Sequence, residues 1–216
     1  MNDLTSILKN NFKNIEKLPA EEQKQILALV EELEEAKTRE EARKSFLPFV
    51  KLMWPSFIHG RHHEIMAEAF ERVAHGELKR LIINMPPRHT KSEFASYLFP
   101  AWFLGMYPEK KVIQTAHTAE LSVGFGRKVR NLIQNEDFQN VFPGIELSTD
   151  SKAAGRWNTN KRGDYFAIGV GGAVTGKGAD ILIIDDPHSE QEATMGEYNP
   201  EVYNKVYEWY TSGPRQ

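Results

Sequence analysis

Apolar residues recur at helical spacing along the N-terminal part of the chain, in three successive sets. The sets are Leu4, Ile7, Leu8, Phe12 and Ile15; then Ile26, Leu27, Val30 and Leu33; then Ala42, Phe46 and Val50. Pro19 separates the first two sets. Thr38 followed by Glu41 has the form of a capping box, which predicts that a third helix starts there and ends at the sequence WPSF. We therefore predict an N-terminal helical region over residues 1–57.

Residues 58–216 alternate between helical spacing and short apolar runs. Helices are predicted from Arg61 to Gly76, over SEFASYLFPAWFLGM, and over EVYNKVYEWYTS. The runs RLIINM, KVIQTA, YFAIGV and ILIIDD are rich in β-branched residues and predict buried strands. Continuous apolar strands alternating with helices are typical of an α/β fold in which helices cover both faces of a mainly parallel sheet.

Composition narrows the class of protein. The chain has 216 residues, 40% of them hydrophobic, which suits one α/β domain with appendages. Its formal net charge of -3 gives no bulk attraction for nucleic acid, so any DNA contact should be local. The absence of cysteine excludes disulfides, thiol catalysis and cysteine-ligated zinc or iron–sulfur sites.

The two ends of the chain indicate its cellular context. The start lacks the pattern of a secretory signal, and no apolar run approaches the roughly 20 residues that span a bilayer. We expect a soluble intracellular protein without membrane contact. Because the sequence stops at a turn after its last predicted helix, we expect a fragment or an excised domain.

The stretch NMPPRHTKSE, residues 84–93, ends in Lys-Ser as a phosphate-binding P-loop does. The pattern G-x-x-x-x-G-K-[ST] would require glycine at Met85 and Thr90, but a predicted strand before the loop and a helix after it are the right context. Backbone N–H groups would then hold phosphate oxygens, Lys91 would reach the β- and γ-phosphates, and the Ser92 hydroxyl would bind Mg²⁺. The alternative is an ordinary strand–loop–helix connection with a capping serine.

A second polar motif follows another apolar run, at ILIIDDP. Asp185 and Asp186 stand just past the predicted strand, in the arrangement called Walker B. In such a site Asp185 would hold Mg²⁺ and Asp186 would orient or deprotonate the attacking water. The second acid is usually glutamate, so the shorter Asp186 would need the water closer. The alternative is a pair of solvated acids in a turn before Pro187, but the two motifs together favour a nucleotide site.

The chain from about Phe46 onward resembles the ATPase part of the large terminase subunit, the motor that packs DNA into tailed-phage and herpesvirus-type capsids. The motifs that carry the resemblance are PPRHTKSE, FGRKVRNLI, FPGIELSTDSKAAGRWNT, GVGGAVTGKGADILIIDDP and VYEWY. The resemblance implies a P-loop NTPase fold of the ASCE type in residues 58–216. It also implies an ATP-binding loop made of Pro87, Arg88, His89, Thr90, Lys91 and Ser92. Thr90 is a departure, because glycine usually precedes the lysine.

The same resemblance implies a function and partners. ATP hydrolysis would drive double-stranded DNA into a procapsid, by a homo-oligomeric ring working with the portal protein and the small terminase subunit. The protein would act in the cytoplasm of the infected bacterium and transiently at the procapsid portal. No nuclease is expected in this chain. A helicase-like or other motor ATPase, and a non-catalytic assembly module in which Thr90 and Asp186 are signs of decay, remain alternatives.

Several residues compete for two further roles. Such ATPases use a cation to stabilise transition-state charge, and the candidates are Arg88, Lys177 and the pair Arg127 and Arg130. We favour Arg88 as a contact within one subunit and Lys177 as a cation facing a neighbouring subunit. The alternative for each is an ordinary surface cation. The stretch WPSFIHGRHH precedes the first predicted core strand, so Trp54, Arg61 or His63 is a candidate to contact adenine. The alternative for Trp54 is a core or hinge residue.

Two further patterns are not interpreted as sites. HHEIMA is not the zinc motif H-E-x-x-H, because Ala67 stands at the position of the second histidine, and no zinc is predicted. GVGGAV lacks the third glycine of a dinucleotide-binding turn. We interpret it as a turn that lets residues Thr175 to Gly178 approach the nucleotide.

Overall fold

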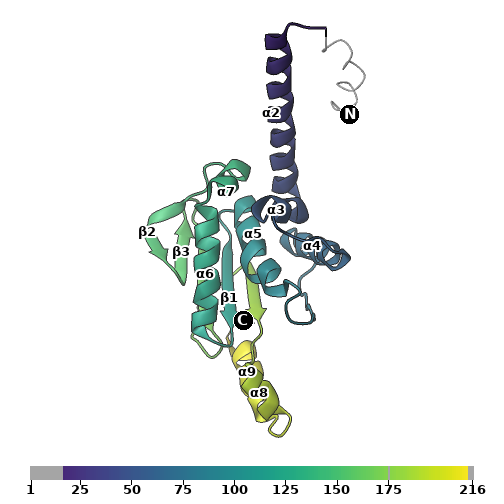
Figure 1. Cartoon of the computed structure of the whole chain (residues 1–216). Helices are drawn as coiled ribbons and strands as arrows, with labels where there is room; N and C mark the ends of the chain where they lie inside the picture. The colour runs from purple at the N-terminus through teal and green to yellow at the C-terminus, as the bar shows by residue number, and fades with distance from the viewer. Residues whose placement is uncertain (1–16, 175, 214–216) are drawn as a thin grey trace. The chain divides into compact units, whose positions relative to one another are not determined.

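The computed structural model describes residues 17–174 and 176–213, and the chain forms two compact units, Met1–Glu41 and Ala42–Gln216 (Figure 1). The helix predicted over Leu4 to Ile15 lies outside the described residues. The units divide at Glu41, before the predicted boundary at residue 57. The physical reason is that α3 (Phe46–Met53) buries Phe46, Phe49 and Val50 in the core of the second unit.

Helix α2 (Ala20–Lys44) is continuous, so the prediction of a new helix at Thr38 is wrong. The Thr38 hydroxyl does not cap a helix but donates to the Glu34 carbonyl oxygen, four residues earlier, at 2.9 Å. One residue further on, Arg39 pairs with Glu35 in the same i, i+4 spacing. These bonds run along an uninterrupted helix, and the chain leaves it only at Ser45, whose extended backbone precedes α3.

The second unit contains a five-stranded open sheet in the order β2-β3-β4-β1-β5. The strands are β1 (Lys111–Ala116), β2 (Leu147–Ala153), β3 (Arg156–Thr159), β4 (Asp164–Gly169) and β5 (Ile181–Asp185). The strands β4, β1 and β5 are parallel, as predicted from their apolar runs. The antiparallel strands β2 and β3 were not predicted, and they make the sheet mixed.

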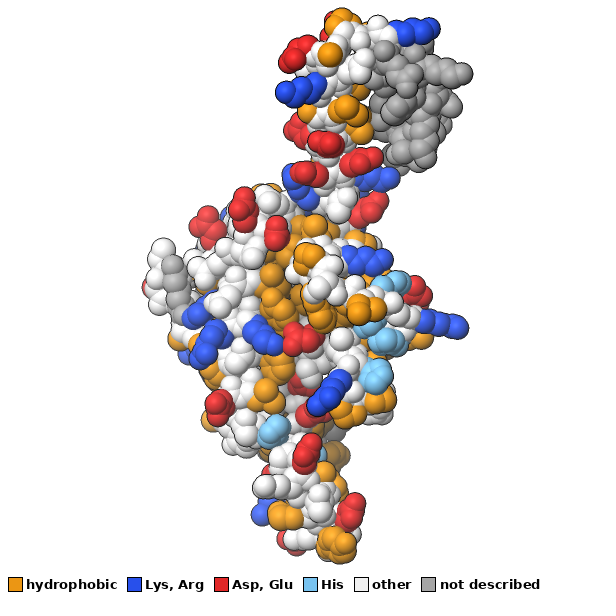
Figure 2. All heavy atoms as spheres, viewed as in Figure 1, with side chains coloured by type: hydrophobic (Ala, Val, Ile, Leu, Met, Phe, Trp, Pro, Cys, Tyr) orange, Lys and Arg blue, Asp and Glu red, His pale blue; other side chains and the backbone are white. Residues whose placement is uncertain are grey.

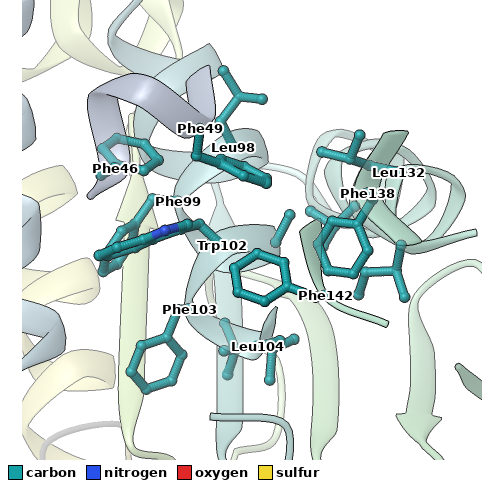
Figure 3. Close-up of a cluster of buried hydrophobic side chains, with 14 of the residues drawn as sticks. Phe46, Phe49, Leu98, Phe99, Trp102, Phe103, Leu104, Leu132, Phe138 and Phe142 are labelled. Carbon is teal, nitrogen blue, oxygen red and sulfur yellow. The ribbon is translucent and has the colours of Figure 1, made fainter. Parts of the chain in front are cut away.

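One face of the sheet carries the core. Helix α6 (Ala119–Ile133) packs on β1 and β4, and α5 (Phe99–Met106) packs on α6 (Figure 1). Beneath them Trp157 and Tyr165 stack with ring centroids 4.7 Å apart. Figure 3 shows how aromatic side chains from α3, α5 and α7 (Glu136–Val141) fill the space between these helices.

The run RLIINM, residues 80–85, is not the predicted buried strand. It forms no ladder with any strand of the described residues. Ile82 is 84% exposed, while Leu81, Ile83 and Met85 pack against the core in alternation. The apolar pattern therefore reflects alternate burial of side chains, but a segment becomes a strand only where a neighbour pairs with it.

Three more helices complete the second unit: α4 (Arg61–Ala74), α8 (Glu190–Gly196) and α9 (Glu201–Ser212). The first and last were predicted, whereas α8 was missed although Ser189 and Glu192 form a capping box. Among the described helices none is long and apolar enough to cross a membrane. Figure 2 shows acidic and basic side chains interspersed over the viewed face, consistent with the small net charge.

Candidate functional site

The loop from Pro86 to Ser92 is shaped by two left-handed residues. Arg88 has φ 63° and Thr90 has φ 65°. Thr90 stands where the P-loop pattern requires glycine. Its backbone adopts a left-handed conformation that glycine favours, although threonine is β-branched. The departure in residue type has not removed the left-handed turn.

The Thr90 side chain is hydrogen bonded on both sides. Its hydroxyl donates to the His89 carbonyl oxygen at 2.6 Å, and His63 Nε2 lies 2.8 Å from the same Oγ1. Because His63 Nδ1 accepts from the Gly60 N–H at 2.9 Å, we assign the proton to Nε2, which donates to Thr90. Burial and the neighbouring His62 and His59 lower the pKa of His63, in keeping with a neutral ring.

Lys91 connects the loop to the carboxyl end of β5 by ion pairs. Its Nζ lies 2.5 Å from Asp186 Oδ1 and 3.9 Å from Asp185 Oδ1. The two motifs are 95 residues apart in the sequence. The structure thus places the lysine of the first motif beside both acids of the second.

The two acids have different surroundings. The side chain of Asp185 is 5% exposed, whereas that of Asp186 is 60% exposed. Asp185 Oδ2 accepts from the Ser96 hydroxyl at 2.9 Å, and Gln114 Nε2 donates to Ser96 at 3.2 Å. Asp186 has φ 39°, and its carbonyl oxygen accepts from the His117 N–H. The alternative of two solvated turn acids therefore does not describe Asp185.

Ser92 precedes η1 (Glu93–Leu98), a π-helical segment that leads into α5. The Ser92 side chain makes no capping hydrogen bond. The interpretation of this residue as a simple capping serine is therefore wrong. π-helical turns occur frequently at functional sites because the extra residue redirects side chains.

Ser96 and Gln114 were missed by the sequence analysis. Both are fully buried, and together with Asp185 they form a polar group inside an apolar core. The available signal was a polar residue in the middle of each apolar run, SEFASYLF and KVIQTA. Within the described residues Gln114 Oε1 has no hydrogen-bond partner, which is uncommon for a buried amide.

The candidate cations lie in different places. Arg88 is exposed in the loop itself. Lys177 Nζ lies 3.3 Å from the ring centroid of Phe166 in β4. In the sheet register Ile113 of β1 is the partner of both Phe166 in β4 and Leu182 in β5, so these side chains share one face of the sheet. Side chains alternate along β5, which places Asp185 on the opposite face. In this arrangement Lys177 does not join Lys91 and the two acids.

Of the three expected adenine contacts, Trp54 and His63 are part of an aromatic cluster next to the loop, whereas Arg61 is exposed at the start of α4. Trp54 packs on Phe57 at 5.4 Å between centroids, and Phe57 contacts His63 and Phe94 at 4.6 and 5.6 Å. His63 is 3% exposed and both ring nitrogens have partners within the chain. Its observed role is to contact the loop rather than to face solvent, while Trp54 remains half-buried.

The predicted magnesium ligands are Ser92 and Asp185, and the ion would have to be held mainly by phosphate and water. The described residues contain no group of three or more His, Cys, Asp or Glu side chains that could hold a metal by themselves. Mg²⁺ in nucleotide sites typically takes only one or two protein oxygens besides phosphates and waters. Asp185 and Ser92 offer that number.

In comparisons with protein-family models, curated proteins and solved structures, no match to the chain was found.

Proposed function

We propose that this chain is an ATP-hydrolysing motor domain of the terminase large-subunit type. The observation that carries the proposal is the meeting of Lys91 with Asp185 and Asp186 at the end of a parallel strand. Ligands of open α/β sheets bind beyond the carboxyl ends of the strands, where this group lies. The resemblance of the sequence motifs to those of the terminase large subunit is the reason for proposing a DNA-packaging motor.

Each residue has a role that follows from its surroundings. Lys91 binds the β- and γ-phosphates, and in their absence Asp186 neutralises its charge. Mg²⁺ would be held by Ser92 and by Asp185, whose carboxylate accepts a hydrogen bond from Ser96. When bound, the ion would neutralise charge on the phosphate oxygens. Asp186 is free to orient water once the phosphates take over Lys91. Arg88, which is exposed in the same loop, would add a second cation.

The wider function rests on the resemblance. We propose that hydrolysis moves double-stranded DNA into a procapsid, with the portal protein and the small terminase subunit as partners. A homo-oligomeric ring would bring a cation from a neighbouring subunit. For Lys177 to serve as that cation, it would have to leave the Phe166 ring.

Nucleotide binding tests the proposal directly. Isothermal titration of MgADP into the chain is expected to show binding that Lys91→Ala weakens by about 100-fold or more, because several charge-assisted hydrogen bonds are lost. Lys110→Ala is the matched control, since Lys110 also pairs with an aspartate, Asp180, at 2.9 Å. Equal affinity in the wild type and Lys91→Ala would show that the loop is not a phosphate site.

A further inference from the structure

Thr90 raises a physical question that the proposed function leaves open. A β-branched residue at φ 65° is unfavourable, and such strain persists only where surrounding contacts determine the conformation. Glycine would adopt the same turn without strain. Contacts within this chain must therefore keep the Thr90 backbone in its left-handed conformation.

The contacts of the Thr90 hydroxyl form a directed series of hydrogen bonds. The Gly60 N–H donates to His63 Nδ1, His63 Nε2–H donates to Thr90 Oγ1, and the Thr90 hydroxyl donates to the His89 carbonyl oxygen. All three bonds are 2.6–2.9 Å long, and each donor and acceptor is used once. The series connects α4 to the middle of the loop.

The histidine end of this series is rigidly packed. The His63 ring lies 4.6 Å from Phe57 and 5.0 Å from Phe94, measured between centroids. One turn further along α4, Met66 and Ala67 are buried in the core. In contrast, Arg88 and His89 on the outer side of the loop are exposed. His63 is therefore the fixed point against which the loop is held.

We propose that His63 and Thr90 are positioning residues that keep the phosphate-binding loop in its left-handed turn before nucleotide arrives. The inference rests on the proposed nucleotide site and deepens it. Where a ligand must order a flexible loop, that ordering lowers the affinity. Here the threonine hydroxyl and the histidine hold the loop without nucleotide, so less ordering is left for the binding step.

Four variants test the pair. Thr90→Val keeps the β-branched shape and removes the hydroxyl, whereas Thr90→Ser keeps the hydroxyl. His63→Phe keeps a ring and removes the N–H, and the fourth variant combines His63→Phe with Thr90→Val. Thr90→Val replaces no buried ring, so it preserves the test if His63→Phe lowers the stability of the fold.

Two measurements are made on each variant: amide hydrogen exchange of residues 86–92 without nucleotide, and the Kd for MgADP. Thr90→Val and His63→Phe are each expected to speed exchange and to weaken binding about five- to tenfold, because each removes the His63–Thr90 bond and one further bond of the series. Thr90→Ser keeps the hydroxyl, so its exchange rates and its Kd for MgADP should match those of the wild type. The double variant removes all three bonds, and its loss should fall short of the sum of the two single losses, because both single variants remove the same His63–Thr90 bond.

Unchanged exchange in Thr90→Val and His63→Phe, or additive losses in the double variant, would overturn the inference. The outcome is separable from that of the proposed function. If the wild type and Lys91→Ala bind MgADP equally while exchange responds to the variants, the nucleotide site fails and the positioning pair stands. If only Lys91→Ala loses binding and the other variants behave as wild type, the positioning pair fails alone.

Discussion

A lysine–aspartate ion pair lies at each end of strand β5, and the two pairs differ in what surrounds them. At the amino end Lys110 pairs with Asp180 at 2.9 Å, and the Lys111 N–H donates to the same carboxylate. At the carboxyl end Lys91 pairs with Asp186 at 2.5 Å. The first pair joins two neighbouring strand starts. The second joins a strand to a loop from a distant part of the chain.

The two ion pairs differ in the backbone conformation and burial of the residues around them. Asp186 and Thr90 have left-handed backbones, and Asp185 next to them is a buried carboxylate. Strain and buried charge cost stability, and proteins tend to retain them where they serve a site. At the amino end, Lys110 and Asp180 are both partly exposed. An ion pair is therefore evidence of a site only when costly features accompany it.

The largest expected effect lies in turnover. Asp186→Asn should bind ATP but hydrolyse it about 10² to 10⁴ times more slowly, because the group that orients water is lost. Asp185→Asn should instead weaken Mg²⁺-dependent binding. Steady-state hydrolysis and nucleotide titration of both variants check this division. Normal binding in Asp185→Asn together with lost binding in Asp186→Asn would reverse the two roles.

A smaller effect is expected at Ser96, whose hydroxyl orients Asp185. Ser96→Ala should raise the Mg²⁺ concentration for half-maximal nucleotide binding about fivefold, since one hydrogen bond to the carboxylate disappears. ADP binding without Mg²⁺ should not change. Ser122→Ala is the matched control, because Ser122 is equally buried but donates to the Thr118 carbonyl oxygen. The same Mg²⁺ dependence in both variants would exclude a positioning role.

The smallest effect belongs to the amino end. Desolvation raises the pKa of Asp180, but hydrogen bonds from Lys110 and Lys111 and their charges outweigh it, so the pKa is lowered from 3.8. A lowered pKa stabilises the fold above about pH 4, and the contribution is lost as pH falls through the folded-state pKa.

Thermal unfolding of the wild type and Asp180→Asn measures this contribution. At pH 7 the Tm values should differ by no more than about 2 °C, as is typical of exposed pairs, and the difference should shrink in acid. MgADP affinity should be the same in both proteins. A Tm difference that grows below pH 4, or a loss of affinity, would contradict the contrast between the two ends.

The sequence predicted the central strands well and the sheet edges less well. KVIQTA coincides with β1, and YFAIGV and ILIIDD differ from β4 and β5 by one residue at the ends. Their apolar runs reflect burial on a parallel sheet, which is a local property. Pairing is not local, and this explains why RLIINM was predicted as a strand and why β2 and β3 were missed.

The same distinction applies to the site. Lys91, Ser92, Asp185 and Asp186 were found because their motifs are contiguous in sequence. Ser96 was missed because its direction depends on the winding of η1, and the His63–Thr90 bond was missed because it depends on how α4 packs. Contacts between distant segments depend on the folded core, which the motifs do not encode.

The π-helical turn η1 has a consequence for insertions and deletions. The Phe99 N–H donates to the Phe94 carbonyl oxygen five residues back, so this turn holds one residue more than an α-helical turn. Pro100 cannot donate to the Ser96 carbonyl, and its ring would crowd that oxygen in a regular helix. Deleting one residue between Ala95 and Leu98 would therefore be tolerated only together with a replacement of Pro100. Homologous chains should gain or lose the extra residue and the proline as a pair.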